Sequence, residues 1–187
     1  MKNLRQMLGL IIMMIFGAIN VQAQDEVIYD GLRYQTRLEG KDKVTCYQVN
    51  GVEEGNTTEE LNIPDEIDGI KVTRITANAF KNNKNIKKVN FGANINTAGW
   101  GCFEGCSNLE YVYIQEGVNL IEGRAFFDCA KLEAINLPST LTTLGEYAYK
   151  GCDAVTRVII PMSVKTLTGG SQFNHCDNLS NVIFEAG

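Results

Sequence analysis

Six cysteines and a single histidine are the residues best suited to chemistry in this chain of 187 residues. Cys102 and Cys106 have the spacing CxxxC, and Cys176 directly follows His175. Three chemistries use such residues. Six cysteines in an exported protein can form disulfides, clustered thiolates can hold zinc in a closed tetrahedron, and a thiol beside an imidazole can act as a nucleophile. The spacing of these residues along the chain discriminates between the three.

Four of the cysteines recur at a regular period, which argues against a disulfide framework. They follow one another at intervals of 23 or 24 residues and are Cys106, Cys129, Cys152 and Cys176. Residues in register on stacked turns lie about 5 Å apart with parallel side chains, whereas a disulfide needs Cβ atoms about 3.8 Å apart. We therefore expect buried free thiols, which pack as small hydrophobic groups, with bridges as the alternative. A linear ladder of thiols also lacks the tetrahedral geometry of a zinc site.

The other candidates for catalysis are weak. Cys102 falls at a position otherwise held by alanine, so we interpret it as a small core residue. His175 occupies a turn position that holds Gly105, Asp128 and Gly151 in other copies, which indicates a solvated side chain. Sequence neighbours in such a turn rarely point together, and no third group suggests itself to orient a Cys–His pair. We predict a protein that is not an enzyme, with no catalytic residue, metal site or cofactor.

These residues belong to a repeat that organises most of the chain. Its clearest copy is 109–131, LEYVYIQEGVNLIEGRAFFDCAK. A fixed period near 23 residues is typical of a solenoid, and of leucine-rich repeats in particular. The expected copies are 58–85, 86–108, 109–131, 132–154, 155–178 and, in part, 179–187.

Apolar residues recur at fixed positions of each copy. The first, fourth and sixth positions are apolar, as in Leu109, Val112 and Ile114, and the last two alternate with variable residues, which indicates a strand with one buried face. Each copy then has an aromatic residue followed three positions later by the ladder cysteine, as in Phe126 and Cys129. One turn cannot bury these side chains alone, but stacked turns can, because each position then forms a continuous column.

The copies resemble the bacterial leucine-rich repeats called Treponema pallidum-type or BspA-like. Leu120–Gly123 (LIEG) and Ala125–Cys129 (AFFDC) stand where that family has them, and the resemblance runs from about residue 58 to the end of the sequence. Ala98, Gln172 and Asn83 depart from the family's pattern. The expected fold is an α/β repeat solenoid, in which strand, loop and short helix alternate and the strands form a parallel sheet on one face. The resemblance also implies an extracellular binding role, since BspA-like proteins include surface adhesins that bind host matrix proteins.

Two segments precede the repeats. Residues 1–23 combine a basic start, an apolar run short for a membrane span and small residues before Gln24, which predicts a cleaved signal peptide, with an uncleaved anchor as the alternative. Residues 24–57 hold two stretches rich in β-branched and aromatic residues, Val27–Leu38 and Lys43–Asn50. We predict a β-hairpin that caps the first turn of the solenoid. A separate binding module is disfavoured, because roughly thirty residues bury little core alone.

The two end copies are irregular. In the first, Asp65–Arg74 is longer than its counterparts, and the run Ile70–Ile75 suggests an extra strand, with a longer loop as the alternative. The last copy reaches only one strand, Leu179–Glu185. Open strand edges invite pairing, so self-association through Leu179–Glu185 is one expectation, and a truncated repeat array is another.

The chain is acidic, which disfavours nucleic acid as a partner. It has 17 basic and 22 acidic side chains, a formal net charge of −5, and loss of Lys2 and Arg5 with the signal peptide makes this −7. Nucleic acid binding depends on clustered Lys and Arg that neutralise phosphates. The local cluster within residues 81–88 is interpreted as a solvated repeat edge rather than an anion site; it comprises Lys81, Lys84, Lys87 and Lys88.

Residues between the buried strand positions should face outward and form the binding surface of the solenoid. Most are small or polar; the exceptions are the candidate ligand-binding residues, Lys88, Tyr111, Tyr113, Arg157, Ile159 and Ile183. Exposed Tyr, Arg and aliphatic side chains are enriched in interface cores, although strands favour Tyr and Ile in any case. The tyrosine pair and the Arg–Ile pair should flank a shallow depression at Ala134 and Asn136.

Three hypotheses about function result. The first is an exported binding or adhesion module for an extracellular protein or glycan, located at the cell surface, in the periplasm or in the medium, with no membrane span once the signal peptide is removed. The second is a structural or self-associating cell-envelope protein assembled through its last repeat. The third, an enzyme or inhibitor, has no supporting constellation of residues.

Overall fold

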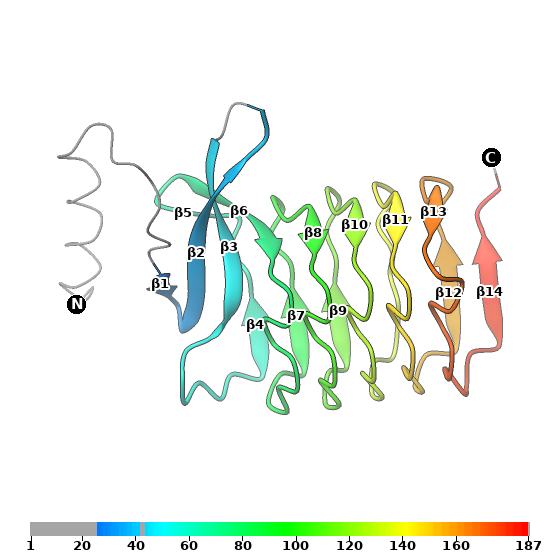
Figure 1. Ribbon diagram of the computed structural model, residues 1–187. Coiled ribbons are helices and arrows are strands. Elements are labelled where there is room, and N and C mark those ends of the chain that lie inside the picture. The colour runs from blue at the N-terminus through cyan, green and yellow to red at the C-terminus, as the bar shows by residue number, and fades with distance from the viewer. Residues whose placement is uncertain (1–25, 42–43, 187) are drawn as a thin grey trace, which may run out of the picture.

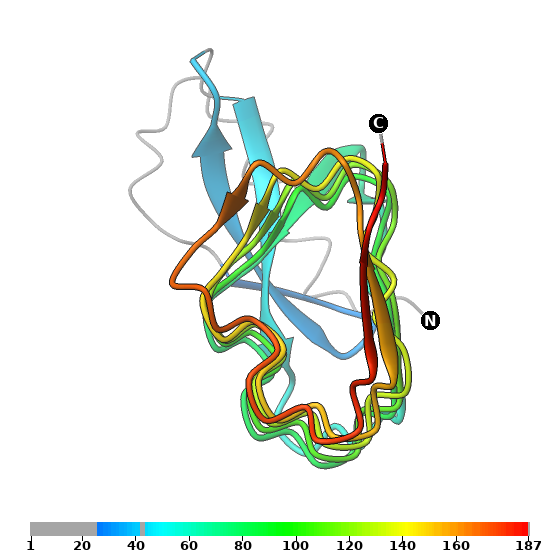
Figure 2. The ribbon, with the colours of Figure 1, turned by 90° about the vertical axis from the view of Figure 1, so that its right-hand side faces the viewer.

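The computed structural model describes residues 26–41 and 44–186, which form a β-solenoid of about six turns (Figure 1). The predicted signal peptide, 1–23, lies outside these residues. Viewed along the stack, successive turns superimpose as a flattened coil with strands on two of its sides (Figure 2). The described residues contain strands and turns but no helix. The predicted solenoid is confirmed, but its assignment to the α/β class is wrong.

One side of the coil, named here the strand face, carries strands expected from the apolar triplets. Its first sheet contains β4 (Glu60–Asn62), β7 (Lys88–Asn90) and β9 (Tyr111–Tyr113), and its second contains β12 (Arg157–Ile160) and β14 (Asn181–Phe184). All of these strands pair in parallel, with each central apolar residue opposite the same position of the next copy. The repeat register read from the sequence is therefore confirmed for both sheets.

The strand face is interrupted at the copy that begins with Leu132. The sequence predicts a strand at Leu132–Leu137, but in this fully described stretch the sole strand-type pairing is an isolated parallel bridge between Ile135 and Val158. The prediction of one continuous sheet on this face is therefore wrong. Ala134 stands where the preceding copy has Tyr111, and Ala favours strands less than Tyr does, whereas Asn136 shares its position with Asn62 and Asn90, which lie in strands.

A second side of the coil carries a sheet that was not predicted. Its two-residue strands β8 (Thr97–Ala98), β10 (Leu120–Ile121), β11 (Thr143–Leu144) and β13 (Thr166–Leu167) pair in parallel and in register. The sheet continues through β6 (Ile70–Ile75), so the extra strand in the first copy is confirmed. This side is continuous along the stack, unlike the strand face.

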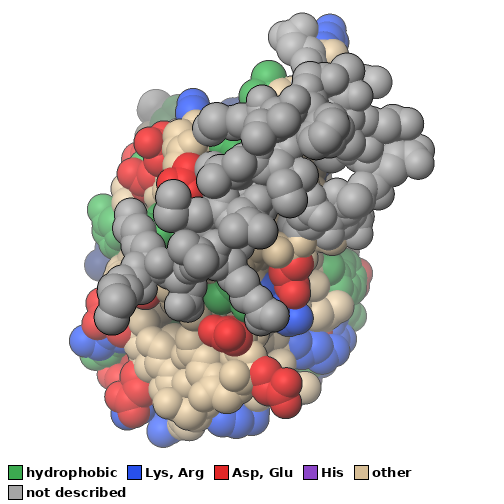
Figure 3. Space-filling model, turned by 90° about the vertical axis from the view of Figure 1, so that its left-hand side faces the viewer, with side chains coloured by type: hydrophobic (Ala, Val, Ile, Leu, Met, Phe, Trp, Pro, Cys, Tyr) green, Lys and Arg blue, Asp and Glu red, His purple; other side chains and the backbone are tan. Residues whose placement is uncertain are grey.

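An N-terminal hairpin extends the second sheet. β2 (Leu32–Glu39) and β3 (Val44–Val52) pair antiparallel, β1 (Glu26–Tyr29) adds to β2, and β3 pairs in parallel with β6. The short strand β5 (Glu66–Ile67) pairs antiparallel with β6. The hairpin itself is thus confirmed, and its far end projects beyond the stacked turns (Figure 1). Viewed from this end, acidic and basic side chains lie around an area of other side chains and backbone (Figure 3).

A column of stacked aromatic rings runs through the core. Successive ring centroids lie between 5.0 and 5.9 Å apart, with nearly parallel planes, in the order Phe80, Phe103, Phe126, Tyr149 and Phe173. Burial of one such side chain contributes about 1.5–3 kcal/mol, and aromatic pairing adds about 0.5–1.5 kcal/mol. The column therefore links each turn energetically to the turns on both sides.

The ladder cysteines form a second column beside the rings. All six cysteines are buried and free, which confirms the prediction of unbridged thiols. Each ladder thiol donates a hydrogen bond to a main-chain carbonyl of the preceding turn, as from Cys106 to Phe80 at 3.0 Å and from Cys129 to Phe103 at 3.2 Å. The same contact recurs for the other two ladder cysteines. These carbonyls also accept a main-chain N–H, as Phe80 does from Asn83 at 3.0 Å, so the thiol is a second donor in addition to filling space.

The segments predicted as short helices are runs of turns. Around Phe126, Arg124 and Asp128 have φ values of 57° and 55°, in the left-handed region that a right-handed helix cannot contain. The N–H of Phe126 bonds the Ala148 carbonyl of the next turn at 2.8 Å, whereas the N–H of Phe127 bonds the Arg124 carbonyl at 3.0 Å. Because alternate N–H groups bond between turns, the i to i−4 ladder of an α-helix cannot form.

Candidate functional site

The structure places all six candidate ligand-binding residues on the strand face, in two groups. The first group lies on β7 and β9 and the second on β12 and β14; they are Lys88, Tyr111 and Tyr113, and Arg157, Ile159 and Ile183. All six side chains are exposed, and all but Ile183 flank buried residues of their strands; β14, which carries Ile183, is exposed throughout. The interrupted copy lies between the two groups.

Tyr111 is held by two neighbours. Its hydroxyl donates a hydrogen bond to the carboxylate of Glu133 at 2.5 Å. The Lys88 ammonium lies 5.9 Å from the centroid of its ring, within the range of a cation–π contact. The bond to the carboxylate raises the pKa of Tyr111, so the hydroxyl stays protonated as a donor. The ring is therefore oriented before any ligand arrives.

Tyr113 is the free aromatic of the pair. Its side chain is 60% exposed and makes no hydrogen bond or ring contact with the described residues. Its neighbour in register is Asn90, whose Nδ2 donates to Asn62 at 2.7 Å and to Glu60 at 3.3 Å. The polar groups of the earlier turns are thus occupied by one another, whereas the Tyr113 hydroxyl and ring are available to a partner.

The second group combines a cation with an apolar pair. Ile159 and Ile183 are opposite each other in the β12–β14 pairing, and each is 39% exposed. Arg157 is exposed beside Ile159, and among the described residues it forms no ion pair. This group offers an apolar contact and a planar cation that can bind a carboxylate through two hydrogen bonds.

The two groups are separated by a gap in the main-chain hydrogen bonding, named here the open rung. In the register of the preceding strands, the N–H and C=O of Val112 would pair with Ala134 and Asn136, but neither bond is present. Across the described stretches 109–114 and 132–137, a single backbone bond joins the two turns, from the Glu133 N–H to the Glu110 carbonyl at 3.0 Å.

The side chains beneath the open rung are less tightly covered than their neighbours. Val112 and Ile135 are 8% and 6% exposed, whereas Val89 and Val158, at the same position on either side, are each 1% exposed. The copy at which the sequence predicts a depression therefore carries unpaired main-chain donors and acceptors, which a ligand or water can bind.

Sequence reasoning missed two features of this surface. Glu133 was not among the candidates, because it lies outside the two outward columns, yet it fixes the Tyr111 ring. The open rung was also missed, although the low strand preference of Ala134 is a signal that could have indicated it.

The four clustered lysines do not form a free anion site. Lys81 pairs with Glu104 at 3.2 Å, Lys87 pairs with Glu59 at 2.9 Å, and Lys84 donates to main-chain and side-chain oxygens of the next turn. The fourth, Lys88, contacts a tyrosine ring as described above. These contacts support the interpretation of the cluster as a repeat edge.

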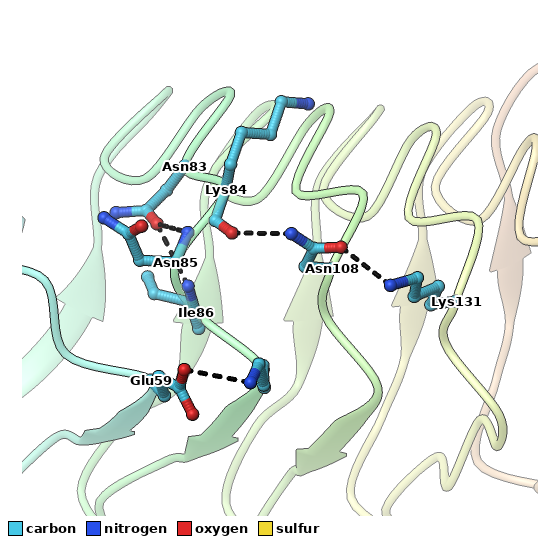
Figure 4. Close-up of polar contacts among 8 residues, drawn as sticks. Glu59, Asn83, Lys84, Asn85, Ile86, Asn108 and Lys131 are labelled. Atoms are coloured by element: carbon cyan, nitrogen blue, oxygen red, sulfur yellow. Dashed lines mark hydrogen bonds and ion pairs between the residues drawn. The ribbon is translucent and has the colours of Figure 1, made fainter.

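The same edge is held by amide side chains that bridge turns (Figure 4). Asn108 Nδ2 donates to the Lys84 carbonyl at 2.7 Å, and Lys131 Nζ donates to Asn108 Oδ1 at 2.9 Å. Asn83, which replaces the ladder cysteine of the first copy, accepts the N–H groups of Asn85 and Ile86 at 2.8 and 3.1 Å. Where the ladder cysteines donate to a carbonyl of the preceding turn, Asn83 instead accepts main-chain N–H groups of its own turn.

The residues considered first for chemistry are used structurally. His175 has φ 55° and an exposed side chain, as its turn position predicts, whereas Cys176 is buried and donates to the Tyr149 carbonyl at 3.0 Å. Burial raises the pKa of the Cys176 thiol, which disfavours the nucleophilic thiolate. Among the described residues, no group of three His, Cys, Asp or Glu side chains could hold a metal ion. The same residues include no helix long and apolar enough to cross a membrane.

Comparison with known proteins finds the same architecture in bacterial proteins. Residues 53–180 match, in six copies, the family described as the BspA type leucine rich repeat region. No curated protein matches the sequence. The T. pallidum leucine-rich repeat protein TpLRR is similar in structure, with a TM-score of 0.72, 20% identity and coverage of 85% of this chain and 82% of that protein.

Two further solved structures are similar over part of their length. A leucine-rich repeat protein from Bacteroides ovatus ATCC 8483 has a TM-score of 0.72 and 27% identity, over 85% of this chain and 42% of that one. A leucine rich cell surface protein from Faecalibacterium prausnitzii A2-165 has a TM-score of 0.71 and 23% identity, over 88% and 44%. The chain spans less than half the length of these two proteins.

Proposed function

The chain belongs to the BspA-type leucine-rich repeat family, and from this premise we propose that it is an exported, non-catalytic binding or adhesion module for an extracellular protein or glycan. Leucine-rich repeat proteins are generally protein-binding modules, and solenoids bind through extended surfaces. The proposed site is the part of the strand face that carries the two groups of candidate residues.

The observation that supports this site is the exposed, unoccupied Tyr113 beside a preoriented Tyr111. Rigid aromatic side chains bury a large area at a small entropic cost, and such residues dominate interface energies. Export is supported by the pattern of residues 1–23. A location at the cell surface is supported by the similar Faecalibacterium prausnitzii protein, which is described as a cell surface protein.

The test is binding of the mature chain to a panel of purified extracellular matrix proteins and glycans. We expect at least one saturable partner, for which the double change Tyr111→Ala and Tyr113→Ala weakens binding by about 2 kcal/mol, or roughly thirtyfold. Trp100→Ala is the matched control, because Trp100 is 45% exposed outside the strand face. If the control loses binding and the double variant keeps it, with both folded by circular dichroism, the site is elsewhere.

We further propose that the hairpin β2–β3 caps the stack. The first turn of a solenoid has an apolar side without a neighbour, and hairpin residues such as Tyr34, Tyr47 and Val49 belong to the same buried core as the repeats. Replacing Tyr34, which is fully buried, by alanine should therefore loosen the first repeats as well as the hairpin.

Self-association through Leu179–Glu185 is the second candidate. Its support is the exposure of Val182 and Phe184, at 45% and 65%, whereas Val158 and Ile160 at the same positions are 1% and 3% exposed. Light scattering after size exclusion should show concentration-dependent dimers that Phe184→Asp abolishes. A monomer at all concentrations would exclude this candidate.

A further inference from the structure

Each exposed cation of the strand face has a carboxylate close by. Lys88 on β7 is in register with Glu60 on β4. Arg157 lies one turn from Glu133, because the isolated bridge on this face joins their two turns. Both carboxylates accept hydrogen bonds from uncharged groups and so keep their negative charges. Since positive and negative groups are interspersed, charge on this face selects neither an anionic nor a cationic ligand.

The exposed ring of Tyr113 lies between two carboxamides. Asn90 is in register with it on one side, and Asn136 holds the same position of the next copy, each about 4.8 Å away along the stack. Asn90 uses its Nδ2 within the earlier turns, but its Oδ1 accepts no hydrogen bond from the described residues. Asn136 is exposed, and its side chain bonds to none of them. An apolar ring face is thus flanked by uncharged donors and acceptors.

The open rung adds main-chain donors and acceptors that only small groups can reach. In a parallel sheet these groups point toward the neighbouring strand, so those of the open rung point into the space between two turns. The turns are joined on both flanks, by the Glu133 N–H to the Glu110 carbonyl at 3.0 Å and by the Gly117 N–H to Thr140 Oγ1 at 2.9 Å. A peptide strand would need about 4.8 Å on each of its sides, whereas a hydroxyl group or a water needs far less room.

We propose, as a deepening of the proposed function on which it rests, that the strand face binds an uncharged glycan, with one pyranose ring stacked on Tyr113. A pyranose with equatorial hydroxyls has an apolar C–H face, which packs on an aromatic face. Its hydroxyls both donate and accept hydrogen bonds. They therefore complement the carboxamides of Asn90 and Asn136 as well as the N–H and C=O groups of the open rung.

The same features disfavour two other ligands. A peptide that binds through its backbone adds to an open sheet edge, and the open rung is closed on both flanks, as described above. An anionic glycan that approached Lys88 or Arg157 would also meet the carboxylate of Glu60 or Glu133. An uncharged ligand that carries hydroxyl groups meets neither obstacle.

The test compares uncharged with charged hexasaccharides. Fluorescently labelled cellohexaose, mannohexaose and N-acetylchitohexaose are titrated with the mature chain by fluorescence anisotropy, beside a heparin hexasaccharide and hexagalacturonate. We expect at least one uncharged sugar to bind more tightly than either charged one. Its affinity should change less than about twofold between about 50 and about 500 mM NaCl, because salt screens charge pairs and this contact contains none.

Variants of the site locate the sugar. Tyr113→Ala should weaken binding roughly thirtyfold, as loss of a central aromatic contact. Asn136→Ala should weaken it about fivefold, as loss of one hydrogen bond. The matched controls are Tyr29→Ala, in β1, and Asn85→Ala, at the repeat edge; both residues are exposed away from the strand face and should have no effect. Circular dichroism checks that each variant is folded.

Three outcomes would overturn the inference. The first is that no uncharged hexasaccharide binds. The second is binding that Tyr113→Ala leaves unchanged. The third is tighter binding of a charged sugar that weakens steeply with salt and with Lys88→Met or Arg157→Met.

The proposed function can be judged separately from these results. If a matrix protein binds and loses affinity for the Tyr111→Ala and Tyr113→Ala double variant, while no uncharged sugar binds, the face binds a partner and the glycan is wrong. If the double change affects neither a protein nor a glycan, both proposals fail.

Discussion

The aromatic column and the strand face run along the same turns, but the residue type repeats from turn to turn in the column and changes on the strand face. In the column, Phe103, Phe126 and Tyr149 are 0–1% exposed, and their rings stack at 5.0–5.5 Å, so each turn repeats its neighbour. In the outward column of the strand face, no residue type recurs from Lys88 through Tyr111, Ala134, Arg157 and Asn181. Similar side chains on successive turns pack well in a buried column, whereas recognition of a specific ligand needs different groups at defined distances. Stability should therefore reside in the repeated positions and binding in the unrepeated ones.

The largest effect is expected when a ring is removed from the middle of the aromatic column. Phe126→Ala should lower the free energy of unfolding by about 3–5 kcal/mol, because it removes a fully buried ring with stacked neighbours on both sides. Urea unfolding measures the change, and the whole stack should loosen, since coupling runs between adjacent turns. A loss below about 1 kcal/mol would show that the column does not hold the turns together.

Alkaline pH should weaken the second repeated column. Burial raises the pKa of Cys106 to about 12 and that of Cys129 and Cys152 well above the ordinary value. In the unfolded chain these thiols ionise near pH 8.5, so above that pH the unfolded state binds fewer protons than the native state. The thiols' contribution to stability is complete below pH 8.5 and declines above it, by at most about 1.4 kcal/mol per thiol per pH unit.

Urea midpoints measured under reducing conditions at pH 7.5, 8.5 and 9.5 check this dependence. Cys129→Ala is the control. Because it removes one buried thiol, it should lose less stability between pH 8.5 and 9.5 than the unchanged chain does, whatever its stability at pH 7.5. Midpoints that do not change between pH 8.5 and 9.5 would mean that the thiols are not protected by the fold.

A smaller effect is expected when only the hydroxyl of one residue in the aromatic column, Tyr149, is removed. The Tyr149 hydroxyl is buried and has no hydrogen-bond partner among the described residues. An unsatisfied buried hydroxyl costs about 1–3 kcal/mol, so Tyr149→Phe should raise the free energy of unfolding by about 1 kcal/mol. Tyr111→Phe, which removes a satisfied and exposed hydroxyl, should not raise it. Destabilisation by Tyr149→Phe would reveal a partner for the hydroxyl, such as a bound water.

The repeated parts of the fold could be predicted from the sequence because each column appears several times. The register of Val89 with Val112, the free ladder thiols and the turn with an exposed side chain at His175 were all predicted correctly. The short helices were wrong because the pattern of Ala125–Cys129 does not show that alternate N–H groups bond between turns. Local sequence also gave little sign of the second sheet, whose strands β8, β10, β11 and β13 have only two residues each.

The candidate site could be predicted only in outline. The alternation of Tyr111 and Tyr113 with Val112 placed the tyrosines outward, which the structure confirms. The contact of Glu133 with Tyr111 depends on where the side chain of a neighbouring turn points, and spacing alone does not give this. The open rung depends on whether the low strand preference of Ala134 outweighs the main-chain pairing that the adjacent turns offer, and spacing alone does not give that outcome. Whether these residues bind a partner stays a prediction.

The separation of stability from binding is tested most directly by two tyrosines of opposite exposure. Tyr113 is 60% exposed on the strand face, and Tyr149 is 1% exposed in the ladder. Tyr113→Ala and Tyr149→Ala should be compared by urea unfolding and, at a temperature where both are folded, by affinity for the same matrix partner. We expect Tyr149→Ala to lose about 3–5 kcal/mol of stability with unchanged affinity, and Tyr113→Ala to lose less than about 0.5 kcal/mol of stability but roughly thirtyfold in affinity. Unchanged affinity in Tyr113→Ala, or equal loss of stability in both variants, would contradict the separation.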